Sequence, residues 1–383
     1  MVGYSVNIGV IYKEGSGRVL KPIMRLTKAI EKLGHRSWYI EIDKIASFVG
    51  YGEKSGIWYR EEQISKILDG AFLRTFGSGS CEALSYRISA MEHLEFCGVR
   101  LMNRTYAMRQ AKDKYATLFY LEKAGLPIPK TVISGHLESA YNEFKNLQKA
   151  VIKPLIGSRG LGVSRVVNET VAYYIMKNIT RLNEIIYLQE LLELPGEDFR
   201  LFVIGNRVIA AMKRRASKGE WKTNISQGGK PIKFVPSADM EDLAVRAVKA
   251  LKLDYAGVDI AVIDGEYKIL EVNAAPAWEG LQTTTDVNIA LTTDTATFTW
   301  NTNEDSNSIV RYDPNTLLAK GYTLGGAWSV LQDASMYDIF WYNWRVYYRI
   351  PCNNGIYFFV DGDSYYLILQ DNTHLHVYEY CDG

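Results

Sequence analysis

The feature that most constrains the fold is a glycine-rich segment, KPLIGSRGLGV at residues 153–163. Strands are expected before it, at 150–154, and after it, at 161–167. Backbone N–H groups of glycines can close around phosphate oxygens, and a lysine adds positive charge. The P-loop and Rossmann loop differ in glycine spacing and run into a helix, while the His-Arg-Asp and Asp-Phe-Gly motifs of a protein kinase are absent. We interpret the segment as a hairpin flap over a nucleotide, although taken alone a plain turn explains it about equally well.

Strand and helix patterns divide the first 290 residues into two regions. Residues 1–104 alternate strands with helices, which is typical of a small α/β layer domain. In it, strands are expected at 5–12, 37–42 and 70–76, and helices at 19–33 and 82–97. Residues 105–290 form a second domain with subdomains of about 105–185 and 186–290, which begins with one long helix at 106–124 and continues with antiparallel strands. Further elements are expected at 185–191, 200–204, 207–214, 241–251 (a helix), 256–263 and 267–272.

Two carboxylates and one amide form a candidate metal site. Glu271 and Asn273 are two residues apart on an expected strand, so their side chains project from one face. Asp259 lies on the preceding strand, and oxygen ligands of these kinds suit Mg²⁺. A three-residue loop centred on Gly265 would pair residue 259 with residue 271, whereas a two-residue turn would put Asp259 on the other face. We predict the three-residue loop; taken alone, this pattern more often marks a solvated strand end.

Two further clusters can serve a nucleotide. Gln189, Glu190 and Leu191 end a strand, where backbone groups can meet the edge of an adenine ring, and Asp198 can hold a ribose hydroxyl. The pair at 214–215 and the KTN stretch at 222–224 supply cations for a transferring phosphate and a substrate carboxylate. Each cluster taken alone is explained more simply, the first as a strand end and the second as a solvated basic face.

The balance of charge and the cysteines exclude several classes of protein. The 383 residues include 44 basic and 43 acidic side chains, which argues against an electrostatic nucleic-acid binder. No apolar run reaches the roughly 18 residues of a membrane helix, and the start lacks a signal-peptide pattern. The four cysteines have no close pairing, which excludes a disulfide scaffold and a zinc ribbon. We expect a cytoplasmic protein that binds neither nucleic acid nor membrane.

Taken in order, these segments resemble the ATP-grasp fold and, within it, the RimK-like glutamate ligases, over roughly residues 1–290. The matching pieces include VIKPLIGSRGLGV at 151–163, YLQELLELPGEDFR at 187–200, YAGVDIA at 255–261 and LEVNAAPAWEGLQTTTDVNIA at 270–290. The stretch FLRTFGSGSCEALSYRISAMEHLEFCGVRLMN at 72–103 is most similar to the branch that caps methanogen coenzymes with glutamate. The resemblance implies an α/β (α+β) ATP-grasp fold that follows a pre-ATP-grasp α/β domain at 1–104.

The resemblance also implies roles for individual residues. Lys114 and Lys153 match the family's two ATP-phosphate lysines. Asp259, Glu271 and Asn273 match its magnesium ligands. The other residues implied to bind ATP are Gly157, Ser158, Gly160, Gly162, Gln189, Glu190, Leu191, Asp198, Lys222, Thr223 and Asn224. The implied catalytic groups are Arg200 and Arg215, as cations facing the acyl phosphate, and Asn224 of the phosphate-proximal stretch. The implied cofactors are ATP and two ions of Mg²⁺ or Mn²⁺.

By the same resemblance, we expect an ADP-forming carboxylate–amine ligase. The γ-phosphoryl group of ATP would pass to an acceptor carboxylate, and the α-amine of L-glutamate would then attack the acyl phosphate. The implied acceptor is a small-molecule carboxylate of the methanogen coenzyme type. Two alternatives stay open: a RimK-like ligase that modifies a protein C-terminus, and a nucleotide-binding scaffold whose C-terminal part binds a partner. A homo-oligomer is compatible with each of them.

The composition changes near residue 290. Residues 291–383 hold 19 of the 47 aromatic residues and carry four basic against eleven acidic side chains, while the first 290 carry 40 against 32. Alternation at 341–350, 355–360, 365–370 and 374–380 predicts a small all-β domain at 291–383. Its opening, LTTDTATFTWNTNEDSNSIVRYD, resembles the first two strands of a fibronectin type III module. A binding module of unknown partner, a structural addition and an unnatural junction near 290 are all open.

Overall fold

The computed structural model describes most of residues 5–290 and six strands beyond residue 340. Within 5–290, the residues that it does not describe are 14–20, 156–161, 218–222, 224 and 226–227. In the C-terminal strands it describes the backbone alone. The chain divides into two compact units, residues 1–301 and 302–383.

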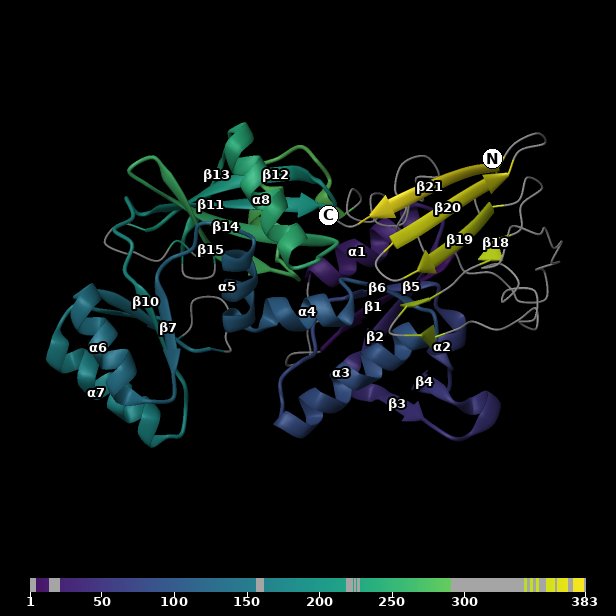
Figure 1. Cartoon of the computed structure of the whole chain (residues 1–383), viewed down its shortest axis with the longest axis horizontal. Helices are drawn as coiled ribbons and strands as arrows, with labels where there is room; N and C mark the ends of the chain where they lie inside the picture. The colour runs from purple at the N-terminus through teal and green to yellow at the C-terminus, as the bar shows by residue number, and fades with distance from the viewer. Residues whose placement is uncertain are drawn as a thin grey trace. The chain divides into compact units, whose positions relative to one another are not determined.

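The first unit opens with a parallel four-stranded sheet, as the alternating pattern predicts. Its strand order is β2-β1-β5-β6 (Figure 1). Alternate residues of β1 pack on opposite faces, so that Ile8 and Val10 join a core with α1 while Ile11 joins a core with α3. The bounds are β1 Asn7–Tyr12, α1 Lys21–Lys32, β2 Arg36–Glu41, β5 Gly70–Leu73, α3 Cys81–Phe96 and β6 Arg100–Met102.

A small hairpin is inserted between β2 and β5. Strands β3 and β4 pair antiparallel, and two short 3₁₀ turns and one helical turn adjoin them. The bounds are η1 Ile42–Lys44, β3 Ile45–Phe48, η2 Gly52–Lys54, β4 Gly56–Tyr59 and α2 Ile64–Ile67.

The single helix predicted at 106–124 is wrong, because Asp113 divides it into α4 (Thr105–Lys112) and α5 (Lys114–Lys123). The backbone of Asp113 is extended, with φ −88° and ψ 109°. Its carboxylate accepts hydrogen bonds from the N–H groups of Tyr115 at 2.8 Å and Ala116 at 3.1 Å. Asp113 is therefore the N-cap of a new helix, and a side-chain cap of this kind leaves no trace in apolar periodicity.

The glycine-rich segment joins two antiparallel strands, which confirms the predicted hairpin. Ala150 pairs with Val166 and Ile152 with Ser164, while the loop at 156–161 lies outside the described residues. The sheet has the order β7-β10-β8-β9, and two helices that the sequence analysis did not anticipate, α6 and α7, pack on one side of it (Figure 1). The bounds are β7 Thr131–Ser134, α6 Leu137–Leu147, β8 Ala150–Lys153, β9 Ser164–Val166, α7 Glu169–Arg181 and β10 Ile186–Glu190.

A five-stranded antiparallel sheet, β13-β12-β11-β14-β15, completes the first unit. Helix α8 covers one face, where Leu243 and Ala247 join the core with Val258 and Ile260. The other face is left for the candidate site. The bounds are β11 Glu197–Ile204, β12 Arg207–Arg215, β13 Lys230–Lys233, α8 Ala238–Ala250, β14 Tyr255–Ile263, β15 Glu266–Asn273 and α9 Glu279–Gln282.

The predicted pairing of residues 259 and 271 is present, but the predicted three-residue loop is wrong. Ile263 pairs with Glu266, so the turn has two residues, Asp264 and Gly265, with φ of 51° and 85°. The register shifts between residues 259 and 260, because Leu270 is an extra residue that forms a β-bulge. The bulge, rather than the turn, places Asp259 opposite Glu271.

One buried side chain joins the parallel sheet to the β14–β15 hairpin. Asn103 is fully buried and donates from Nδ2 to the carbonyl oxygens of Tyr255 at 2.9 Å and Ala274 at 2.7 Å. Its Oδ1 accepts from the N–H groups of Asp254 at 2.6 Å and Tyr255 at 3.1 Å. Ala274 directly follows Asn273, and Tyr255 begins the strand that carries Asp259. Asn103 therefore fixes the end of the β14–β15 hairpin that is opposite its turn.

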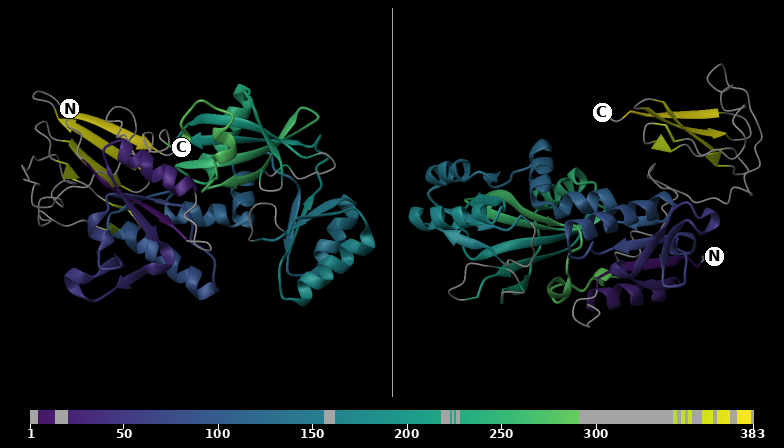
Figure 2. Two further views of the ribbon diagram at one scale, coloured as in Figure 1. Left: turned by 180° about the vertical axis from the view of Figure 1, so that it is seen from behind. Right: turned by 90° about the horizontal axis from the view of Figure 1, so that it is seen from below.

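The second unit contains strands, in agreement with the predicted all-β domain. Four of them pair antiparallel in the order β18-β19-β20-β21, and β16 pairs with β17 (Figure 2). The region that resembles fibronectin type III, 291–313, lies outside the described residues. Among the described residues of the whole chain, no helix is both long and apolar enough to cross a membrane. The bounds are β16 Trp341–Tyr342, β17 Arg345–Val346, β18 Arg349–Ile350, β19 Ile356–Asp361, β20 Ser364–Gln370 and β21 Leu375–Cys381.

Candidate active site

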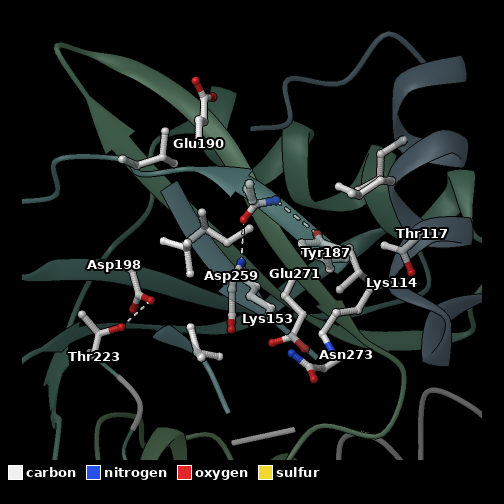
Figure 3. Close-up of a pocket in the computed structure, with 18 of the residues that line it drawn as sticks. Lys114, Thr117, Lys153, Tyr187, Glu190, Asp198, Thr223, Asp259, Glu271 and Asn273 are labelled. Atoms are coloured by element: carbon white, nitrogen blue, oxygen red, sulfur yellow. Dashed lines mark hydrogen bonds between the residues drawn. The ribbon is translucent and has the colours of Figure 1, made fainter. Parts of the chain in front are cut away.

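A pocket of about 260 Å³ brings many of the predicted site residues together. It is lined by residues of helix α5, of strands β8 and β10, and of the five-stranded sheet, and it combines leucine side chains with the charged ones labelled in Figure 3. The predicted residues that line it are Lys114, Lys153, Gln189, Glu190, Leu191, Asp198, Thr223, Asp259, Glu271 and Asn273.

Charged residues on β11, β12 and β14 form a continuous network at the polar end. Arg214 donates to both oxygens of Asp198 at 2.6 Å and also lies 2.9 Å from Oδ2 of Asp259. Arg200 donates to both oxygens of Asp259 at 2.6 and 2.7 Å. Thr223 donates to Asp198 at 2.6 Å (Figure 3). Paired arginines and carboxylates of this geometry hold one another in fixed positions.

The network determines the charge state of its buried members. Burial alone would raise the pKa of Asp259, but Arg200 and Arg214 outweigh it and hold that pKa below its ordinary value. Burial likewise opposes the charge on Arg214, but Asp259 and Asp198 raise the pKa of its guanidinium above the ordinary value. Asp259 is therefore an ionised carboxylate at neutral pH.

The chemistry of Asp259, Glu271 and Asn273 fits a divalent cation such as Mg²⁺. Oδ1 of Asp259 accepts one hydrogen bond, from Arg200, which leaves it a lone pair for a metal. Oδ1 of the Asn273 amide would be the third ligand, whereas its buried Nδ2, which has no partner among the residues that the structure describes, can only donate. The same part of the chain holds no group of three His, Cys, Asp or Glu side chains placed to bind a metal ion. Two carboxylates and an amide suit an ion that also takes water and phosphate oxygens as ligands.

Two lysines approach this carboxylate set from the opposite wall. Lys153 donates from Nζ to Oε1 of Gln189 at 2.5 Å, and Gln189 is fixed in turn by hydrogen bonds with Thr131 and Tyr187. Lys114 donates to the carbonyl oxygen of Leu155 at 3.3 Å. Burial lowers the pKa of Lys153 from 10.5 to about 8, with the charge of Glu271 opposing this shift and that of Lys114 adding to it. Burial also lowers the pKa of Lys114.

The pKa of Lys153 leads to a pH-dependent affinity for nucleotide. If the charged amine binds phosphate, the dissociation constant of an unhydrolysable ATP analogue should rise about tenfold between pH 7 and pH 9, because Lys153 loses its proton through about pH 8. Isothermal titration calorimetry across this range measures the effect. Lys153→Arg should flatten the profile, since arginine stays charged. An equally steep profile in that variant would assign the effect to another group.

The same shift has a defined effect on folding. Because the folded state has the lower pKa, protonated Lys153 opposes folding below about pH 8, and this opposition disappears as the pH rises from about 8 to 10.5.

The other end of the pocket is apolar and suits a planar ring. Leu118 and Leu121 of α5 line it together with Leu191, Leu192 and Leu270. Glu190 lies at the rim, where its carboxylate accepts from Lys268 at 2.7 Å and from the N–H of Lys130 at 3.0 Å. A ring between two aliphatic walls, with a polar strand edge beside it, is the arrangement expected for a base.

Several predicted residues lie elsewhere. Arg215 faces away from the pocket and pairs with Glu197 at 2.5 Å, because neighbouring residues of a strand point to opposite faces. Arg214 faces the pocket instead, and the pairing of Asp198 with Arg214 determines which of the two does so. Gly162, with φ 74°, follows the flap loop. The remaining predictions fall outside the described residues: Gly157, Ser158, Gly160, Lys222 and Asn224.

Other pocket residues were not singled out from the sequence. Thr117 and Tyr187 line the polar side, and Lys112 lies at the end of α4 near the metal-ligand candidates. No motif marks them, since only the pairing of distant strands and the division between α4 and α5 bring them to the site.

Comparison with known proteins decides the family. A model of the RimK-like ATP-grasp domain matches residues 111–294. A tetrahydromethanopterin:alpha-L-glutamate ligase of Methanosarcina acetivorans is 32% identical over 257 residues, which cover 60% of this chain and 79% of the archaeal protein. A probable alpha-L-glutamate ligase of Haemophilus influenzae is 33% identical over 273 residues, which cover 70% of this chain and 91% of that protein. The chain belongs to the RimK-like ATP-grasp family.

Solved structures share the fold of this ATP-grasp ligase. The ATP-grasp ligase PsnB in complex with a minimal precursor has a TM-score of 0.61 at 20% identity, over 77% of this chain and 99% of that one. The macrocyclase MdnC of Microcystis aeruginosa has a TM-score of 0.58 at 16% identity, over 75% of this chain and 98% of its own. A further PsnB structure contains Mg and ADP. At these identities the likeness concerns the fold.

Proposed function

We propose that this ATP-grasp ligase joins L-glutamate, through its α-amine, to a carboxylate of a small-molecule acceptor of the tetrahydromethanopterin type. The observation that supports the proposal is that one pocket is lined by the candidate metal ligands, Asp259, Glu271 and Asn273, and by two lysines, Lys114 and Lys153. The identity of 32–33% to named alpha-L-glutamate ligases supports the choice of glutamate.

The reaction proceeds in two steps. In the first, an acceptor carboxylate oxygen forms a bond to the γ-phosphorus while the bond between that phosphorus and the β-phosphate oxygen breaks, which releases ADP. In the second, the glutamate amine attacks the carbonyl carbon of the acyl phosphate, the C–N bond forms, and the C–O bond breaks to release phosphate. The amine proton passes to the departing phosphate or to water.

The residues of the chain divide this work. Lys114 and Lys153 hold the phosphates by charge, while the leucine-lined end holds the base. Arg200 and Arg214 hold Asp259 in position, and with Glu271 and Asn273 it would hold Mg²⁺, which would neutralise charge on the transferring group. As the family resemblance implies, the glycine-rich segment would cover the nucleotide and exclude the water that would hydrolyse the acyl phosphate.

Product analysis tests the proposal. The protein is incubated with ATP, Mg²⁺, L-glutamate and, in separate reactions, tetrahydromethanopterin, the deazaflavin coenzyme and a peptide with a free C-terminus. We expect ADP only when glutamate and one acceptor are both present, with an acceptor product heavier by one glutamyl residue. Formation of AMP instead would contradict the acyl-phosphate route, and ADP formation with the peptide alone would replace the small-molecule acceptor by a protein C-terminus.

A further inference from the structure

Two lysines that a continuous helix would separate line the same pocket. Lys112 ends α4 and Lys114 begins α5, and both line the pocket. In one uninterrupted helix, residues two apart point about 200° away from each other. The extended backbone at Asp113 removes that constraint, while its own side chain turns to the N–H groups of α5. The break therefore adds a third lysine to the charged end of the pocket.

Lys112 differs from the other two lysines in its contacts. Lys153 donates to Gln189 and Lys114 donates to the carbonyl of Leu155. Lys112 makes no hydrogen bond or ion pair within the part of the chain that the structure describes, and its side chain is exposed at the rim. Its ammonium group is therefore available to a ligand.

The charges around Lys112 favour an anion beside it. The pKa of Lys112 lies below its ordinary value. The main cause is partial loss of hydration next to the protein; the charges of Arg74 and Lys114 add to the shift, and the charge of Glu271 opposes it. Arg74 adds positive charge and makes no ion pair with the residues that the structure describes: it donates to the hydroxyl of Tyr255 at 3.0 Å and the carbonyl of Pro276 at 2.7 Å, and its guanidinium lies over the ring of Trp278. Neighbouring cations repel one another, and an anion bound between or beside them offsets this repulsion.

We propose that Lys112 binds an oxyanion of the reacting groups at the end of the pocket next to Glu271 and Asn273. The oxyanion is either the transferring phosphoryl group or a carboxylate of L-glutamate. The proposal rests on the proposed function, because it takes this end of the pocket as the place where the phosphoryl group is transferred. Lys112 would then act on the groups that react rather than on ADP, and would contribute little to ADP affinity.

Calorimetry on the full chain saturated with MgADP separates these possibilities. Inorganic phosphate and L-glutamate are titrated in turn into wild type, Lys112→Met, Lys112→Arg and Lys123→Met. Lys123 is the matched control, because it is an exposed lysine in the last turn of the neighbouring helix and lies outside the pocket. Loss of one charge-assisted hydrogen bond should weaken anion binding by about tenfold or more. Lys112→Arg should restore most of it.

Each outcome is decisive. Weaker phosphate binding in Lys112→Met, with MgADP affinity within twofold of wild type, assigns Lys112 to the phosphoryl group. Unchanged phosphate binding with weaker glutamate binding assigns it to the carboxylate. The proposal is overturned if both affinities are unchanged, if MgADP affinity falls as much as phosphate affinity, or if Lys123→Met gives the same loss. Wild type that fails to bind MgADP would instead contradict the proposed function itself.

Discussion

Replacing Glu271 with glutamine should lower kcat for ADP formation by about 10³-fold while leaving the fold intact. The substitution keeps the shape of the side chain and removes one of the two carboxylates of the candidate metal site, and losses of this size follow when charge at a transferring group is no longer balanced. The charge of Glu271 also raises the pKa values of Lys112, Lys114 and Lys153. The fall in nucleotide affinity with pH should therefore begin at a lower pH in this variant.

Glu197→Gln is the matched control for this change. Glu197 lies on β11 of the same sheet, but its carboxylate pairs with Lys213 and Arg215 on the face away from the pocket. Steady-state ADP formation and direct binding of Mn²⁺, followed by electron paramagnetic resonance, measure both variants. Full activity or unchanged Mn²⁺ binding in Glu271→Gln would remove Glu271 from the metal site.

Asn103→Ala should reduce the free energy of unfolding by about 3–5 kcal/mol, measured by urea denaturation. The side chain is fully buried and its four hydrogen bonds all reach backbone groups, so truncation leaves two N–H and two carbonyl groups without their partners. Asn103→Asp should also destabilise, because a carboxylate cannot donate to Tyr255 and Ala274.

The control for this prediction is Asn146→Ala. Asn146 is an exposed residue of α6 whose side chain bonds to Glu143 at 3.1 Å. We expect a change within about 0.5 kcal/mol there. A loss at Asn103 no larger than at Asn146 would show that the junction between the parallel sheet and the β14–β15 hairpin does not depend on this side chain.

The sequence predicted those parts of the fold and site that depend on local patterns. The hairpin around the glycine-rich segment follows from strand alternation and is present. The pairing of Asp259 with Glu271, predicted because it lets the ligands converge, is also present, but a bulge produces it rather than the predicted three-residue loop. The two-residue turn was missed because a bulge at Leu270 compensates for it, and a bulge has no local signature here. The break at Asp113 was missed because a cap interrupts a helix without interrupting its apolar pattern.

The choice between Arg214 and Arg215 needed information from another strand. Either arginine satisfies the requirement for a cation, and only the pairing with Asp198 shows which one faces the pocket. Helices α6 and α7 pack on the β7-β10-β8-β9 sheet without contributing to a recognisable motif, so motifs alone do not reveal them. Tertiary pairing, rather than residue type, decides each of these cases.

The bulge at Leu270 has a consequence for how this site can vary. A regular strand offers only every second residue to one face, but here the consecutive residues Leu270 and Glu271 both line the pocket, one among its leucines and the other in the candidate metal site. The strand register that pairs Asp259 with Glu271 is therefore set by the bulge beside these residues and not by the turn. Residues can therefore be added at the Asp264–Gly265 tip without turning Glu271 away, which makes the tip a suitable place to attach a fluorescent reporter of nucleotide binding.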